Sequence, residues 1–204
     1  LAATLPELMG GSADLAPSNN TWMDGYEAFS GKNPLGRNIH FGVREMGMAG
    51  ITNGMAVHGG LIPYCATFLV FSDYLRGALR VSALSKMGSV YVLTHEPIET
   101  VMSLRLIPDL VVMRPADANE TAQAWRYAIE HRDTPVVLAL SRQNLPTFDR
   151  SWVNSADGVQ KGAYTLFQTK PGTPDLIIIA TGSEVQLGLD AAMRLKRQGH
   201  IVRV

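Results

Sequence analysis

Apolar stretches with the character of buried strands alternate along the chain with stretches that have the spacing of amphipathic helices. In the first part of the chain the strand-like stretches are residues 38–42, 61–68, 89–94, 110–115 and 135–141. Helical patterns lie between them, at residues 43–58, 69–86, 98–107 and 117–131. This alternation predicts an α/β fold with a mainly parallel sheet and helices on both of its faces.

A second α/β pattern occupies the end of the chain. Turn-forming residues gather between residues 144 and 162, which favours a linker there. Strand-like stretches then cover residues 163–169, 175–181 and 200–204, and Gly199 closes the helical pattern that precedes the last of them. Because the chain opens without Met and stops within a strand-like pattern, we expect a fragment of a longer protein.

The composition excludes several classes of function. Hydrophobic residues make up 46% of the chain and charged residues 18%, an ordinary balance for a globular protein with a core. The formal net charge of zero argues against nucleic acid or an anionic membrane as the main partner. Cys65 is the only cysteine, so no internal disulfide can form, and a reducing, cytoplasmic compartment is expected.

Glu45 is the candidate with the most unusual surroundings. It begins an apolar helical stretch, and no Asp, Glu, Lys or Arg follows it before Asp73. A glutamate at a helix start commonly just complements the helix dipole. A buried carboxyl without a counter-charge instead favours its protonated form and can donate a hydrogen bond. Gly47, Gly50 and Gly54 share one face of this helix and would let a neighbouring backbone approach closely.

Aromatic and basic residues near strand ends are further candidates. Phe68, Phe71 and Tyr74 are three apart and would share a face if the helix starts early, either as core or as a platform for a flat heteroaromatic ring. His95 and Arg142 each follow a buried strand, where α/β sheets place functional groups. The guanidinium fork of Arg142 suits a phosphate, whereas a surface contact is the simpler interpretation of both residues.

The stretch GGSADLAPSNN, residues 10–20, combines glycines with polar side chains that include Asp14 and Ser18. It is typical either of a turn whose side chains satisfy one another or of a binding loop. The sequence contains no Cys/His metal spacing, no P-loop and no nucleophile elbow.

Five stretches, in this order and spacing, resemble the transketolase family: GGSADLAPSN, IHFGVREMGMAGITNGMAVHGG, TFLVFSDYLR, RPADANE and SRQNLP. The resemblance implies a pyrimidine-binding domain over residues 1–150, a linker over 151–161 and the beginning of a C-terminal domain over 162–204. Members of this family are cytosolic homodimers that use thiamine diphosphate. They transfer a two-carbon ketol unit from a ketose phosphate to an aldose phosphate in the pentose phosphate pathway.

The resemblance also implies roles for the cofactor-binding candidates. Glu45 matches the family glutamate that hydrogen-bonds N1′ of the aminopyrimidine and promotes its imino tautomer. The wall of the pyrimidine pocket would be formed by Phe68, Phe71 and Tyr74. Asp14 matches a residue near the cofactor. The diphosphate and its Mg²⁺ or Ca²⁺ ion would be bound by a domain outside this chain, so no metal ligand is expected within it.

The substrate side of the site would include Ser18, His95 and Arg142, by the same resemblance. Ser18 matches a residue near the sugar phosphate, and Arg142 matches a phosphate-binding arginine. His95 matches one of two active-site histidines, which makes it a catalytic candidate together with Glu45. The cofactor would lie between two subunits.

The sequence departs from the family pattern after Thr94. The family has a loop of the form THDSIGxGEDGPTHxP, whereas LTH is followed here directly by EPIE. About a dozen residues are missing, the size of a functional loop, and His95 can match the histidine at either end of that loop. The abrupt junction favours a mobile loop over an evolved deletion.

Two alternatives stay open from the sequence. One is another thiamine-diphosphate enzyme, such as deoxyxylulose-phosphate synthase or a dehydrogenase E1 β chain. The other is a non-catalytic assembly module, because this chain by itself is expected to be inactive.

Overall fold

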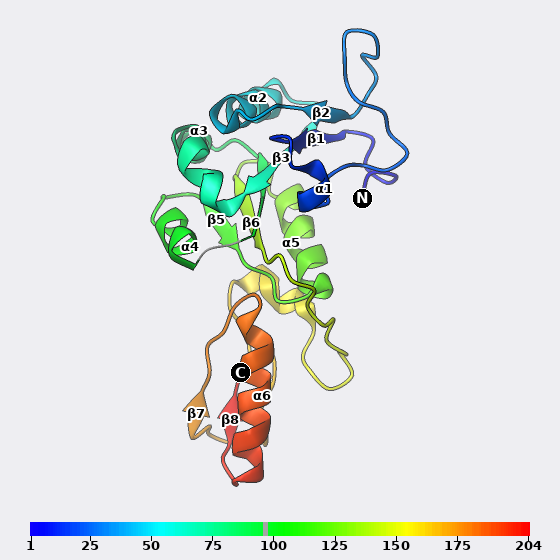
Figure 1. Ribbon diagram of the computed structural model, residues 1–204. Helices are drawn as coiled ribbons and strands as arrows, with labels where there is room; N and C mark the ends of the chain where they lie inside the picture. Colours follow the sequence, from blue (N-terminus) through cyan, green and yellow to red (C-terminus); the bar gives the residue numbers. More distant parts are fainter. Residues whose placement is uncertain (96–97) are drawn as a thin grey trace. The chain divides into compact units, whose positions relative to one another are not determined.

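Six parallel strands form one sheet in the computed structural model, which describes residues 1–95 and 98–204 (Figure 1). The strands are β1 (Leu8–Ser12), β2 (Asn38–His40), β3 (Ile62–Phe68), β4 (Val90–Thr94), β5 (Val111–Met113) and β6 (Val136–Leu140). They are arranged in the order β2-β1-β3-β4-β6-β5, and every pair is parallel. The chain passes from β1 to β2 on one side and returns to β3 on the other, so the order reverses next to β1.

Helices cover both faces of this sheet. On one face, α2 (Glu45–His58) and α3 (Ser72–Leu84) pack through Met48 and Leu79 into a core that contains Tyr91. On the other face, α1 (Ala16–Asn19) contacts Ser12 and Thr94, whose side chains alternate with those of the core face. The expected α/β class with a mainly parallel sheet is confirmed.

Asn53 fixes the position of α2 from within the core. Its amide nitrogen donates to the Ala78 carbonyl of α3 at 2.8 Å. Its amide oxygen accepts from the Tyr91 hydroxyl at 2.5 Å and from the Ser89 hydroxyl at 3.1 Å. Both polar atoms of this side chain are therefore used to join α2 to α3 and to β4 with the residue before it.

The glycine-containing stretch at residues 10–20 is more regular than its composition indicated. Gly10 and Gly11 lie within β1, between two neighbouring strands, and are not part of a turn. A Cβ atom at Gly10 would lie 2.0 Å from the Tyr64 carbonyl oxygen, so only glycine fits this close approach. A short helix, α1, then follows with Pro17 in its first turn.

The chain separates into two compact units, Leu1–Met113 with Ala128–Arg142, and Arg114–Tyr127 with Gln143–Val204. The first contains the sheet and the remaining helix α4 (Ile98–Arg105), together with the short 3₁₀ helix η1 (Leu69–Phe71). Helix α5 (Ala118–Glu130) has residues in both units. Within the described part of the chain, no helix is long and apolar enough to cross a membrane.

The second unit contains a smaller sheet. Its elements are η2 (Ala156–Lys161), β7 (Leu176–Ile177), α6 (Glu184–Arg197) and β8 (Val202–Arg203), and its core includes Phe148, Leu166 and Leu189. The strands are shorter than the apolar patterns predicted. Ile177 and Ile179 are 55% and 90% exposed, so the apolar stretch around β7 has few neighbours to pair with. Residues 163–169 make backbone hydrogen bonds to 202–204 without forming a continuous strand.

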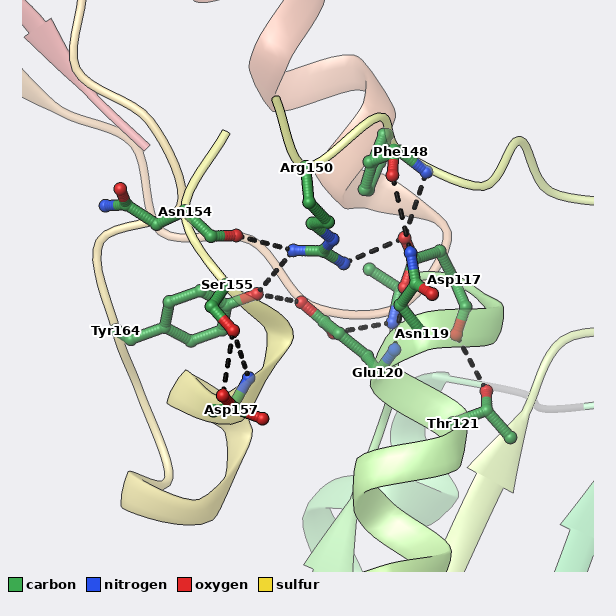
Figure 2. A network of polar contacts seen from close by, with 11 residues as sticks. Asp117, Asn119, Glu120, Thr121, Phe148, Arg150, Asn154, Ser155, Asp157 and Tyr164 are labelled. Atoms are coloured by element: carbon green, nitrogen blue, oxygen red, sulfur yellow. Dashed lines mark hydrogen bonds and ion pairs between the residues drawn. The ribbon is translucent and has the colours of Figure 1, made fainter. Parts of the chain in front are cut away.

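A polar network holds the second unit together around Asp117 (Figure 2). The Asp117 carboxylate accepts from the Glu120 backbone N–H at 2.8 Å, from the Phe148 N–H at 3.0 Å and from the Arg150 guanidinium at 2.8 Å. The Tyr164 hydroxyl donates to Glu120 and also contacts Arg150. Asp117 is therefore the N-cap of α5, because its side chain accepts from a backbone N–H of the first helical turn.

Candidate functional site

The carboxyl ends of neighbouring strands bring several predicted residues to one edge of the sheet. Asp14 follows β1, Phe68 ends β3, His95 follows β4 and Arg142 follows β6. These strands are adjacent in the order β1-β3-β4-β6, and Phe68 is paired in register with Thr94. Ligands of open parallel sheets bind at this edge, next to the point where the strand order reverses.

Glu45 is the first residue of α2 and is only 7% exposed. One of its carboxylate oxygens accepts a hydrogen bond from the hydroxyl of Thr67, a fully buried residue of β3, at 3.3 Å. Arg44 is turned away and donates to the Phe41 carbonyl at 2.9 Å. Among the described residues no basic side chain pairs with Glu45. The buried carboxyl without a counter-charge is thus present in the structure.

Four rings form a continuous row beside this edge. The rings of Phe68 and Phe71 are stacked with centroids 5.9 Å apart and planes 19° apart. The Tyr74 ring follows at 6.1 Å from Phe71, and the His95 ring lies 4.0 Å from Phe68 on the other side. The expected helix face is wrong in detail, because the three aromatic residues lie in β3, η1 and α3, one in each.

His95 has a backbone and a ring that are both constrained. Its φ angle is +59°, in the left-handed region that few residues other than glycine adopt. Its ring nitrogen Nδ1 lies 2.9 Å from the Thr94 hydroxyl oxygen. Burial and, secondarily, the nearby positive charge of Arg142 lower the pKa of His95 below its usual value. Both effects favour the neutral ring, the form that can accept a proton.

The remaining predicted residues are exposed and are not bonded to the others. Asp14 has a φ angle of +58° and an exposed side chain. Ser18 lies exposed in α1, and Arg142 is exposed after β6. Among the described residues, no hydrogen bond joins these three side chains to Glu45 or His95. Their place at the open edge of the sheet is compatible with contacts to a ligand.

Sequence reasoning missed the residues that hold the candidates in place. The Thr67 hydroxyl donates a hydrogen bond to Glu45. The Thr94 hydroxyl contacts the His95 ring and donates to the Asn19 side chain. Thr67 and Glu45 are 22 residues apart and Thr94 and Asn19 are 75 apart, so no local pattern connects them. The junction after Thr94, where the family loop is missing, includes residues 96–97, which lie outside the described residues.

The parallel sheet, with a buried carboxyl and an aromatic row at its carboxyl edge, defines an α/β protein with a candidate ligand site at its strand ends. The sequence matches the family model "Transketolase, pyrimidine binding domain" over residues 1–147. It matches the "Transketolase-like TK C-terminal domain" over residues 162–204. The chain therefore belongs to the transketolase family.

Individual relatives agree with the family match. A transketolase of Nostoc sp. is 52% identical over 219 residues, covering 100% of this chain and 32% of that protein. A crystal structure of Pichia stipitis transketolase in complex with sedoheptulose-7-phosphate superposes with a TM-score of 0.92 and 42% identity, over 100% of this chain and 32% of that one. The Leishmania mexicana transketolase gives a TM-score of 0.92 and 43% identity, with the same coverage.

The chain spans about a third of the length of these relatives, 32% in each case. The alignment with the Nostoc protein extends over 219 residues, which is longer than the 204 residues of this chain. That relative therefore contains residues within the matched region that this chain lacks.

Proposed function

We propose that this chain supplies the pyrimidine-binding half of a transketolase active site. The reaction is the transfer of a two-carbon ketol unit from a ketose phosphate to an aldose phosphate, with thiamine diphosphate as cofactor, in the pentose phosphate pathway. The observation that carries the proposal is Glu45, whose carboxyl is buried at the start of α2 with Thr67 as its hydrogen-bond donor. The domain model that matches residues 1–147 is named for pyrimidine binding.

The side chains present fit the aminopyrimidine of this cofactor. A ring nitrogen needs a hydrogen-bond partner, and the Glu45 carboxyl, which is only 7% exposed, can provide one. A flat ring also needs a plane to pack against, which the stacked rings of Phe68 and Phe71 provide, with Tyr74 extending the row. The bound cofactor supplies the electron sink of the reaction, while these residues bind and orient its ring.

The sugar phosphate would contact the exposed candidates at the strand ends. Arg142 offers a guanidinium fork that matches phosphate oxygens, and Ser18 offers a hydroxyl. His95 would act on a hydroxyl of the sugar, and Asp14 would lie near the cofactor. The complex of the Pichia stipitis relative with sedoheptulose-7-phosphate supports a sugar phosphate as the ligand.

A homodimer would complete the site, and α2 carries the surface for it. Gly47, Gly50 and Gly54 are exposed, and a Cβ atom at Gly50 or Gly54 would meet nothing within 4 Å. Met46 and Ile51 beside them are 52% and 54% exposed. An apolar helix face with a glycine stripe suits close contact with a second copy. In the whole enzyme, the second subunit would supply the diphosphate-binding domain, which lies outside this chain, so that the cofactor would lie between two subunits.

The domain division follows from the same assignment. We propose a pyrimidine-binding domain over residues 1–150, a linker over 151–161 and the beginning of the C-terminal domain over 162–204. The family matches at 1–147 and 162–204 support this division. A cytoplasmic location is proposed as well, supported by the single cysteine, Cys65, which is buried and free.

The test is ketol transfer by a protein that carries this chain together with the remaining two thirds of a transketolase. We expect transfer that requires added thiamine diphosphate. Glu45→Gln should reduce kcat by about 100-fold or more, because it removes the ionisable group that general acid–base catalysis requires. The far-UV and near-UV circular dichroism of this variant should be unchanged.

Glu7→Gln is the matched control, because Glu7 is exposed and lies at the amino end of β1, away from the site. Its kcat should equal that of the unmodified protein. Near-normal turnover by Glu45→Gln, or ketol transfer without the cofactor, would contradict the proposed function.

A further inference from the structure

We propose that Thr94 and Asn19 are positioning residues that hold the His95 ring with its proton on Nδ1. The other ring nitrogen, Nε2, is then an acceptor. The tautomer of His95 depends on this chain alone, whereas a proton transfer from a substrate to Nε2 rests on the proposed function. A chain of side-chain contacts leads from Ser12 through Asn19 and Thr94 to His95.

The direction of the hydrogen bonds follows from the distances. Asn19 lies between two hydroxyl groups, 2.6 Å from Thr94 Oγ1 and 3.0 Å from Ser12 Oγ. The shorter distance is typical of O–H···O bonds and the longer one of N–H···O bonds. The Asn19 amide oxygen therefore faces Thr94, and its NH₂ group faces Ser12.

Ser12 supports the same orientation of the amide. Its hydroxyl oxygen accepts from the Leu15 backbone N–H at 3.2 Å as well as from the Asn19 side chain. Two N–H donors fill the two lone pairs of a hydroxyl oxygen. Ser12, Asn19 and Thr94 are 3%, 6% and 5% exposed, so water competes little for these positions.

The tautomer of His95 is then determined by Thr94. The Thr94 hydroxyl has one proton, and it donates this proton to the Asn19 amide oxygen. Its oxygen can therefore only accept in the contact with His95 Nδ1 at 2.9 Å. Nδ1 must donate, so in the neutral ring Nε2 bears the lone pair.

One further contact and the backbone conformation restrain this ring. The Phe68 ring lies 4.0 Å from the His95 ring, with the two planes 38° apart. The left-handed backbone at His95 is a strained conformation for a residue other than glycine and is maintained by its surroundings. The lowered pKa of His95, caused by burial and by Arg142, is compatible with a neutral ring near pH 7.

This arrangement gives His95 a defined chemistry. Nε2 can accept the proton of a substrate hydroxyl, so that the O–H bond breaks and an Nε2–H bond forms. The resulting imidazolium keeps its Nδ1–H bond to Thr94, which is itself supported by Asn19. The proton can return from Nε2 to an oxygen of the product by the reverse step.

The test is ¹⁵N nuclear magnetic resonance of the 204-residue chain labelled in its histidines, at a pH where His95 is neutral. The five histidines are distinguished by the spectrum of a His95→Gln variant. We expect the Nδ1 resonance of His95 to show the one-bond coupling to a proton and the Nε2 resonance to lack it. Thr94→Val should lose this preference and shift the ring toward the Nε2–H form, whereas Thr94→Ser should retain it.

Thr52→Val is the control, because Thr52 is equally buried and its hydroxyl donates to the Met48 carbonyl of its own helix. It should leave the His95 resonances unchanged. A ring protonated on Nε2 in the unmodified chain, or in Thr94→Ser, would overturn the proposal even if Thr94→Val does not fold. The spectra need neither cofactor nor substrate, so a failure of ketol transfer would leave this result standing.

Discussion

The Thr67 hydroxyl donates a hydrogen bond to the Glu45 carboxylate across 3.3 Å, and so joins the end of β3 to the beginning of α2. Both residues are buried. Because Thr67 donates to one of the two carboxyl oxygens, it restrains the orientation of the Glu45 carboxyl group.

Thr67→Val is expected to weaken ketol transfer in the assembled enzyme while the fold is preserved. Valine has nearly the same side-chain shape as threonine but has no hydroxyl, so Glu45 loses the hydrogen-bond donor that orients it. A hydrogen bond between neutral groups contributes about 0.5–1.5 kcal/mol, so kcat should fall by about 2- to 12-fold. Steady-state kinetics at saturating cofactor measure this change.

Thr52→Val again serves as the comparison, since its hydroxyl bonds only within α2 and to the buried Cys65 thiol. It should leave kcat within about twofold of the unmodified enzyme. Equal losses of kcat in the two variants would mean that replacing any buried threonine of this core has the same effect. The hydrogen bond from Thr67 to Glu45 would then not be the cause.

The titration of His95 should respond to the charge of Arg142. Burial and Arg142 place the pKa of His95 below its usual 6.5. The unfolded chain then binds the proton more readily, so the contribution of His95 to stability is complete above about pH 6.5 and is lost as the pH falls. Arg142→Gln removes one of the two causes and should raise the pKa of His95, measured by following its ring resonances against pH.

Arg132→Gln provides the matched loss of a positive charge. Arg132 donates to the Leu61 carbonyl, just before the amino end of β3, whereas His95 follows the carboxyl end of β4. It should leave the midpoint of the His95 titration in place. If both variants shift the midpoint equally, the effect comes from net charge and is not specific to Arg142.

The Asp117 carboxylate should be the most sensitive polar group of the second unit. Its side chain is fully buried and pairs with Arg150 at 2.8 Å. Asp117→Ala removes the N-cap of α5 and leaves Arg150 without its partner carboxylate, which costs about 3–5 kcal/mol when a buried pair is broken. Urea unfolding, combined with hydrogen exchange of the Glu120 and Phe148 amides that donate to Asp117, measures the loss.

Asp190→Ala is the surface counterpart in the same unit, because Asp190 lies exposed on α6 with Gln186 as its partner. It should change the free energy of unfolding by less than about 0.5 kcal/mol. Faster exchange of the Glu120 and Phe148 amides in this control would show that the network is not the cause.

The sequence predicted what depends on local pattern. The alternation of strands and helices and the buried position of Glu45 follow from neighbouring residues, and the structure contains them. β1 was missed, because Gly10 and Gly11 give no apolar alternation and owe their place to close contact with the neighbouring strands.

Contacts between distant residues could not be predicted in the same way. The bond from Thr94 to Asn19 joins residues 75 positions apart, and only the pairing of β1, β3 and β4 brings them together. The row of Phe68, Phe71 and Tyr74 was predicted from its spacing, but not its spread over three elements. Local spacing identifies which side chains are unusual, whereas the sheet decides which of them meet.

A substitution in the exposed glycine stripe of α2 should change the stability of the chain and its dimer formation in opposite directions. Gly50→Ala adds a methyl group in open space, where nothing lies within 4 Å. Alanine stabilises a helix by about 0.8–1 kcal/mol relative to glycine, so the isolated chain should unfold at a higher temperature. If the stripe packs against a second copy, the same methyl group should weaken dimer formation, measured by sedimentation equilibrium.

Gly31→Ala, also in open space but outside any helix, should leave the association constant unchanged. A Gly50→Ala variant that associates as strongly as the unmodified chain would place the dimer contact elsewhere.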